Sequence, residues 1–350
     1  MGLPCGTFQE RYAQDMAIFR TRLHWLMLIV FLIFLFTMPL YVSGRWLNLV
    51  IVIGITVITV LGLNILTGYC GQISLGHAAF MAVGAYTSAI LCAKLGWSFW
   101  AAFPTAVLVA GVVGILFGLP SLKVRGFYLI MTTVAAQFII LWVILQMRGI
   151  TGGCDGLATP YPRIGSLVLN TKESYFYLVM VLACLATFAA KNLARTRVGR
   201  AFVAIRDNDL AAEVMGINLY GYKLLAFFIG CMFAGAAGSL WVHYVGLANV
   251  ELFTLTDSIW YLGMLIVGGM GSTMGAIFGT VFLRLLDELI PFIGPAFSSA
   301  FPAIAAQAAA SVGLILHGLI IILFLIFEPR GIAHRWQIAK TYYRLWPFSY

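Results

Sequence analysis

The sequence predicts an all-α polytopic integral membrane protein, and its composition and its charge-free stretches carry that prediction. Hydrophobic residues make up 62% of the 350 residues and charged residues only 9%, whereas soluble domains carry about 25% charged residues. Most charge-free stretches are long enough for a helix that crosses a bilayer, which takes about 20 apolar residues. Strands of a membrane barrel would appear as short alternating segments, which the sequence lacks. We therefore expect about ten transmembrane or half-spanning helices.

The charge-free stretches define these helices in order. The first span is predicted at residues 26–41, and the long stretch 46–93 is predicted to hold two helices that meet at a glycine-rich break. Residues 258–283 contain a second glycine-rich run, so we expect a short helix there and another that ends near Leu289. Residues 149–174 form a polar loop outside the cytoplasm. The remaining spans are predicted at residues 100–119, 127–146, 175–190, 224–244 and 304–327.

The net charge of +9 is concentrated in short clusters rather than spread over a surface. Such clusters between spans are typical of cytoplasmic loops under the positive-inside rule, and they argue against nucleic acid as a partner. We expect both termini to be cytoplasmic. The predicted regions are a cytoplasmic N-terminal segment at 1–24, a transmembrane domain at 25–327 with a cytoplasmic loop at 191–223, and a cytoplasmic C-terminal tail at 328–350.

The chain offers no pattern of an enzyme or of a metal site. Its six cysteines are scattered without a CxxC pair, which indicates neither a disulfide framework nor zinc. No H-E-x-x-H or G-x-S-x-G motif occurs, and His243 and His317 stand alone in apolar surroundings, where structural roles are favoured. Asp287 and Glu288 follow Arg284 by about one turn, which predicts an ion pair at a membrane boundary.

The break within residues 46–93 is the first candidate site. Gln72, Ser74 and His77 lie among its glycines, and polar residues inside a span favour a functional role. A second interrupted segment at residues 268–275 occupies a corresponding place, and paired interruptions indicate a transport site. Close helix packing is the alternative explanation of the glycines. The candidate pathway residues are Gly71, Gln72, Ser74, Gly76 and His77.

The cytoplasmic loop 191–223 is the second candidate site. Residues 201–206 have the pattern of a short amphipathic helix, and Asp207 and Asn208 can cap a second helix that Gly216 ends. A short helix of this kind can lie in a groove of a partner protein. Composition alone leaves open an ordinary solvated loop.

Three motifs resemble those of the branched-chain amino-acid ABC importer permeases. Residues 199–218 resemble the coupling loop of that family, residues 68–80 its first signature, and residues 268–275 a third motif. The similarity runs in order from about residue 60 to 330 and is closest to the longer, second permease type. Cys70 departs from the pattern, which has a small residue there.

The resemblance implies a permease subunit of an ATP-driven importer in the bacterial inner membrane. It would form a heterodimer with a second permease and bind two ATP-binding subunits and a periplasmic binding protein that delivers branched-chain or related small amino acids. The chain would hydrolyse nothing and hold no cofactor, because ATP and magnesium bind the partner subunits. The implied coupling residues are Arg206, Asp207, Asn208, Ala211, Ala212, Glu213, Met215 and Gly216.

Two other functions stay open at this point. A permease for urea or short amides could share the architecture. An ion-coupled secondary transporter would place carboxylates or a histidine–carboxylate pair inside its spans. The spans expected up to Leu283 contain no carboxylate, which argues against ion coupling.

Overall fold

The computed structural model describes residues 22–42, 44–121, 126–164, 167–300 and 305–345, and these are mainly helical. The first half contains α2 (Arg22–Thr37), η1 (Met38–Leu40), α3 (Gly44–Leu63), η2 (Asn64–Tyr69), α4 (His77–Ala93), α5 (Phe99–Ser121), α6 (Phe127–Gln146), α7 (Arg148–Thr151), η3 (Gly153–Asp155) and α8 (Lys172–Arg195). The second contains α9 (Arg197–Asp207), α10 (Asp209–Val214), α11 (Leu219–Val245), η4 (Val250–Leu252), α12 (Leu255–Gly268), α13 (Thr273–Ala300), α14 (Ala305–Phe327) and α15 (Ile332–Leu345).

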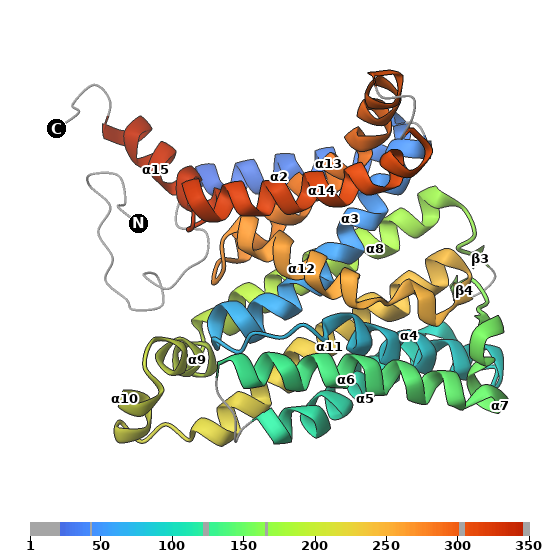
Figure 1. Cartoon of the computed structure of the whole chain (residues 1–350), viewed down its shortest axis with the longest axis horizontal. Helices are drawn as coiled ribbons and strands as arrows, with labels where there is room; N and C mark the ends of the chain where they lie inside the picture. Colours follow the sequence, from blue (N-terminus) through green and yellow to red (C-terminus); the bar gives the residue numbers. More distant parts are fainter. Residues whose placement is uncertain (1–21, 43, 122–125, 165–166, 301–304, 346–350) are drawn as a thin grey trace.

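Helix α11 lies at the centre of one layer of the molecule, where it packs against α3, α4 and α5. Helix α13 packs against α3, α12 and α14, and α14 lies in a second layer above the first (Figure 1). Helix α3 packs against helices of both layers. The amphipathic helix α9 and the short helix α10 lie at one end of the long helices (Figure 1).

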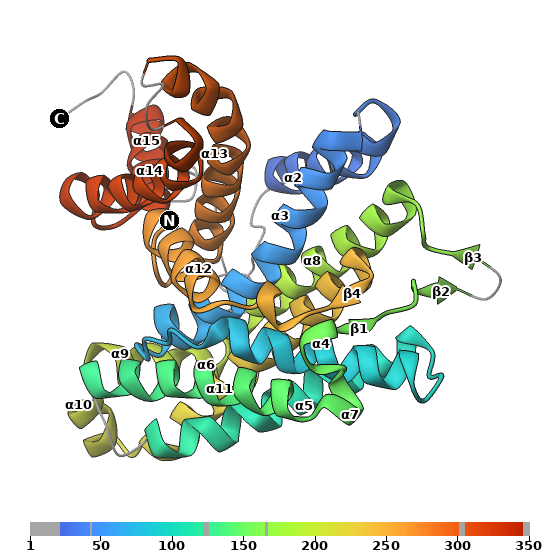
Figure 2. The same cartoon turned by 45° about the vertical axis from the view of Figure 1, so that its right-hand side comes forward.

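Short strands lie at the opposite end from α9 and α10 (Figure 2). Strand β1 (Leu157–Ala158) pairs antiparallel with β4 (Leu247–Ala248), and β2 (Arg163–Ile164) pairs with β3 (Leu167–Val168). The polar loop at 149–174 and the loop at 191–223 thus lie at opposite ends of the long helices, and their placement on the two sides of a membrane stays a prediction.

Six helical segments in the described ranges are long and apolar enough to cross a membrane. A bent pair, His317–Phe327 with Ile332–Tyr343, raises the number to seven if it forms one span. The all-α polytopic fold is confirmed, whereas the expected count of about ten segments is not. The six segments are Gly44–Tyr69, Phe99–Pro120, Tyr128–Gln146, Lys172–Arg195, Leu219–Val245 and Val250–Gly268.

Both glycine-rich interruptions are present. Helix α3 continues into the π-helix η2, the chain then unwinds, and α4 begins at His77. In the second half, α12 ends at Gly268 and α13 begins at Thr273. The expected end of this helix near Leu289 is wrong, because α13 continues to Ala300. Asp287 therefore lies inside a helix rather than at its end.

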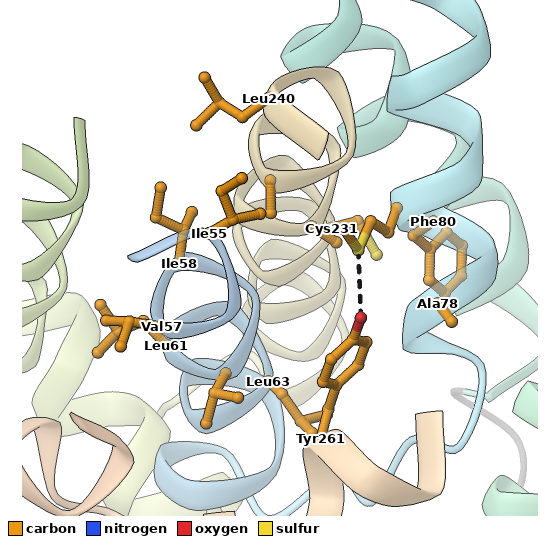
Figure 3. Packing of buried hydrophobic residues seen from close by; sticks show 14 of the residues in the cluster. Ile55, Val57, Ile58, Leu61, Leu63, Ala78, Phe80, Cys231, Leu240 and Tyr261 are labelled. Carbon is orange, nitrogen blue, oxygen red and sulfur yellow. Dashed lines mark hydrogen bonds between the residues drawn. The ribbon is translucent and has the colours of Figure 1, made fainter. Parts of the chain in front are cut away.

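Small residues set the distance between α4 and α11. A Cβ atom on Gly84 would lie 2.3 Å from the Cα atom of Gly235, and one on Gly238 would lie 1.9 Å from the carbonyl oxygen of Met81. The two backbones are thus in direct contact, as is common where helices pack in lipid. Large apolar side chains of α3 fill the space beside them, and the hydroxyl of Tyr261 donates to the sulfur of Met81 at 3.6 Å (Figure 3).

Candidate functional site

The first interruption begins where η2 ends. Gly71 has a φ of +73°, a conformation that favours glycine, and it turns the chain out of the helix. The hydroxyl of Thr67 donates to the carbonyl oxygen of Gln72 at 3.0 Å and fixes the turn. Helix η2, which ends the helical segment that begins with α3, is a π-helix, and π-helical turns are rare and often found at functional sites.

Side chains of other helices satisfy the backbone that this interruption exposes. The amide of Leu75 donates to the hydroxyl of Thr133 at 3.0 Å. The first turn of α4 donates from Ala78 to the Ser258 hydroxyl and from Ala79 to the Gln137 side-chain oxygen, each at 2.9 Å. Unpaired amides at a helix start would be costly in lipid. The three polar partners were not predicted, although polar residues within apolar spans α6 and α12 could have indicated them.

The predicted pathway residues are adjacent, but most of them face the interior in this conformation. Gly71 is exposed, whereas Gln72, Ser74, Gly76 and His77 are buried. The Nε2 atom of His77 lies 3.1 Å from the carbonyl oxygen of Thr59. Within the described residues, Gln72 Oε1 and His77 Nδ1 have no hydrogen-bond partner. These two atoms are therefore available to a polar ligand or water.

Arg206 of α9 joins the two interruptions. Its Nη1 atom donates to the carbonyl oxygen of Gly68 at 2.9 Å. A Cβ atom on Gly71 would lie 2.9 Å from its Cγ, and one on Gly271 would lie 2.8 Å from its Nη1. The amide of Gly271 also donates to Oδ1 of Asn64 at 2.9 Å. We call these five residues the glycine–arginine junction. It unites a predicted coupling residue with the predicted pathway segment, a contact that the sequence did not reveal.

Helix α9 is amphipathic, as predicted. The hydroxyl of Thr196 caps its start, and Phe202 and Ile205 are buried. Its last residue, Asp207, accepts from Arg206 at 3.0 and 2.9 Å. The expectation that Asp207 caps the next helix is therefore wrong, and Asn208 alone does so by accepting from the Ala211 amide at 3.1 Å.

Helix α10 presents an apolar surface at the end of the molecule. Leu210, Val214 and Met215 are 60%, 87% and 82% exposed. Ala211 and Glu213 are also exposed, whereas Ala212 is buried against the rest of the chain. Gly216 follows with a φ of +83° and turns the chain away. Leu210 and Val214 were not among the predicted residues, although their spacing of four places them on one helix face.

The histidines differ from each other. His243 lies in a satisfied buried network, with Nδ1 2.8 Å from the carbonyl oxygen of Pro160 and Nε2 2.8 Å from the hydroxyl of Ser88. Its predicted structural role is confirmed. His317 is not alone, because its Nε2 atom lies 2.6 Å from Oδ1 of Asp287. The described residues contain no group of three or more acidic, histidine or cysteine side chains that could hold a metal ion.

Spanning helices, two interruptions in the membrane domain and an amphipathic pair at one end define a class of proteins, the polytopic transport permeases. Comparison with known proteins narrows the class. Residues 45–325 match the family described as branched-chain amino acid transport system / permease component. The chain belongs to this family. It is thus a multi-pass transport subunit and not an enzyme.

Two similar proteins are the high-affinity branched-chain amino acid transport system permease proteins LivM of Salmonella typhimurium and Escherichia coli. They are 33% and 32% identical over 289 residues, which cover 76% of this chain and 68% of each relative. The permease protein LivH of Escherichia coli is 25% identical over 299 residues, or 80% of this chain and 92% of LivH. No solved structure matches the chain.

We predict that Gly271→Ala destabilises the protein more than Gly96→Ala does. Both glycines have positive φ, of +77° and +66°, so both substitutions strain the backbone. Only the Cβ at residue 271 meets neighbours, at 2.8 Å from Arg206 Nη1 and 3.2 Å from the Gly68 carbonyl oxygen. Such overpacking costs about 1–3 kcal/mol. Thermal unfolding in detergent measures the difference. Equal melting temperatures of the two variants would show that the junction is loosely packed.

Proposed function

We propose that the chain is the membrane-spanning permease subunit of an ATP-driven ABC importer. The importer translocates branched-chain or related small amino acids, which a periplasmic binding protein delivers, across the bacterial inner membrane. Family membership and the names of the relatives support the substrate class. The observation that carries the coupling mechanism is the contact of Arg206 with Gly68, because it links the predicted coupling helix to the predicted pathway.

In this proposal α10 docks on an ATP-binding subunit, and α9 transmits the movement of that subunit to the two interruptions. The exposed side chains of Leu210, Val214 and Met215 form an apolar patch that a groove on the partner would cover. Helix α9 is anchored by its buried face, so a displacement of α10 moves Arg206. Because Arg206 contacts both interruptions, it can change their geometry together.

The complex contains a second permease in addition to this chain. The similarity to LivH, a permease of the same transport system as LivM by name, supports a heterodimer of related subunits. Two ATP-binding subunits supply the energy, so ATP and magnesium are held outside this chain. The basic residues flanking the membrane domain support cytoplasmic termini.

The passing amino acid contacts the segment formed by Gly71, Gln72, Ser74, Gly76 and His77. Two unpartnered polar atoms, Gln72 Oε1 and His77 Nδ1, support this role. A buried polar atom without a partner costs about 1–3 kcal/mol, and a substrate group or water in another conformation would remove that cost. The backbone amides of the interruption do not support this role, because several of them already donate hydrogen bonds to the side chains of Thr133, Ser258 and Gln137.

An ion-coupled secondary transporter is the second candidate. The observation that favours it is the pair formed by Asp287 and His317, with 2.6 Å between Oδ1 and Nε2. Carboxylate–histidine pairs of this kind occur in proton relays of membrane proteins. A permease for urea or short amides is a further alternative. One uptake experiment can test both the energy source and the substrate.

The proposal predicts that leucine uptake into proteoliposomes requires ATP and all of the partners. The chain would be co-reconstituted with the second permease, the ATP-binding subunits and the binding protein, and uptake of radiolabelled leucine and urea would be compared. We expect ATP-dependent leucine uptake that valine and isoleucine compete with and a protonophore leaves unchanged. Uptake driven by a proton or sodium gradient without ATP would establish ion coupling instead, and uptake of urea alone would establish the other alternative.

A second prediction concerns the docking patch. Replacing Val214 and Met215 with Ser should weaken binding of the ATP-binding subunits by about 100-fold or more, because burial of each apolar side chain contributes about 1.5–3 kcal/mol and every 1.4 kcal/mol is about tenfold in affinity. The measurement is retention of these subunits by the purified permease pair. Tyr343→Ser on α15 is the matched control, since Tyr343 is 87% exposed, as Val214 is. Undiminished retention by the double variant would exclude α10 as the docking element.

A third prediction concerns the pathway. Single cysteines at Gln72, Ser74 and His77, in a background without the native cysteines, should react with a membrane-impermeant thiol reagent only in some nucleotide states, because all three positions are buried in this conformation. Leucine should change the labelling. Ala89→Cys, equally buried on α4, should stay unreactive. If the three positions remain as inert as residue 89 in every state of an active complex, the segment is packing.

A further inference from the structure

A group of charged side chains lies at the middle depth of the membrane domain. Arg284 of α13 donates from Nε and Nη2 to the hydroxyl of Thr56, at 3.2 and 3.0 Å. Thr56 lies near the centre of the continuous 26-residue helix Gly44–Tyr69. At 1.5 Å per residue, the hydroxyl is roughly 18–20 Å from either helix end. The guanidinium of Arg284 is therefore near the midplane of the span.

Asp287 lies between Arg284 and His317. Its Oδ2 atom is 3.6 Å from Arg284 Nη1, which is too long for a hydrogen bond. Its Oδ1 atom is 2.6 Å from His317 Nε2. The ring of Trp260 packs edge-on against that of His317, with 3.8 Å between the centroids. Thr56 of α3 and His317 of α14 thus hold two opposite charges of α13 close together. Arg284 and Asp287 form the ion pair that their spacing predicts, without a hydrogen bond between them.

These charges are incompletely buried. The side chain of Arg284 is 26% exposed and that of Asp287 is 36% exposed, whereas His317 is 4% exposed. Charged groups at this depth avoid lipid and face a bundle interior or a water-filled cavity. The open side of Arg284 and Asp287 consequently faces water or the second permease rather than hydrocarbon.

We propose that Arg284 and Asp287 form a binding site for the two charged ends of an amino-acid zwitterion. The guanidinium of Arg284 binds the α-carboxylate, and the carboxylate of Asp287 binds the α-ammonium group. Thr56 and His317 are positioning residues that orient the two charges. This inference rests on the proposed function, and it adds a site distinct from the segment at residues 71–77.

Charge balance supports a zwitterion over other ligands. One cation and one anion side by side match a ligand whose two ends are opposite in sign and whose net charge is zero. A ligand with only one charge would meet a like charge beside its partner, which disfavours it. Urea carries no charge and would leave both groups without a charged partner. The site is therefore selective for the amino-acid backbone, and it leaves the side chain to other contacts.

The test uses the complete reconstituted complex. Arg284→Gln and Asp287→Asn should each raise the apparent KM for leucine uptake at least tenfold, because each removes one charged partner of the substrate. Leucine should also no longer raise the melting temperature of the purified permease pair carrying either change. The matched control is Glu288→Gln, which removes the neighbouring carboxylate of α13, itself paired with Arg45; its KM and its stabilisation by leucine should stay at wild-type values.

Measuring assembly of the complex distinguishes a variant that binds leucine poorly from a variant that folds poorly. Retention of the ATP-binding subunits and basal ATP hydrolysis report an intact complex, and Arg284→Lys, which keeps the charge but loses the planar fork, should fall between wild type and Arg284→Gln in KM. Wild-type KM and wild-type stabilisation by leucine in both charge-removing variants would overturn the site. So would a loss of kcat at unchanged KM, the result expected of a structural ion pair. Absence of leucine uptake by the wild-type complex would instead refute the proposed function.

Discussion

The structure depends on one requirement: every backbone amide and carbonyl within a bilayer needs a partner in the protein. An uninterrupted helix meets it alone, but the chain between η2 and α4 does not. The hydroxyls of Thr133 and Ser258 and the side-chain amide of Gln137 supply the missing partners. Gln137 also donates to the carbonyl oxygen of Phe253 at 2.8 Å. A few polar side chains thereby fix α6 and α12 against the start of α4, and the interruption becomes an ordered element.

Glycine has a different role at the second feature, the glycine–arginine junction. There the requirement is space, because Arg206 lies where side chains at positions 71 and 271 would begin: its Cγ atom is next to Gly71 and its guanidinium is next to Gly271. The same absence of side chains lets Arg206 reach the carbonyl oxygen of Gly68. Close contact makes the junction stiff, and stiffness is what the proposed link between α10 and the segment at residues 71–77 needs. A longer or looser contact would absorb a displacement of α9 instead of transmitting it.

The sequence predicted the features that depend on neighbouring residues. The length of the charge-free stretches predicted the long helices, and the glycines at 68, 71 and 76 predicted the first interruption. The amphipathic pattern after Arg197 and the cap at Asn208 gave α9 and α10. The extent of α13 was misjudged: the helix continues past prolines at 291 and 295 to Ala300, although proline is disfavoured inside a helix. Contacts such as Arg206 with Gly68, 138 positions apart, depend on the tertiary fold, and no local pattern reports them.

The charges of the membrane domain show why a permease can hold ionisable groups and still release its substrate. Asp287 lies beside both Arg284 and His317, so when no ligand is bound the charges of Arg284 and Asp287 stabilise each other and neither is left alone at membrane depth. A zwitterion must compete with this internal pairing, which lowers its net affinity. Gln72 and Ser74, by contrast, are neutral and can form only weaker hydrogen bonds. In the proposed mechanism, the amino acid meets a weakly binding charged site near the midplane and a neutral segment toward α9, and neither of them holds it too tightly. Rapid transport requires this property, since a site that bound the zwitterion strongly would retain it.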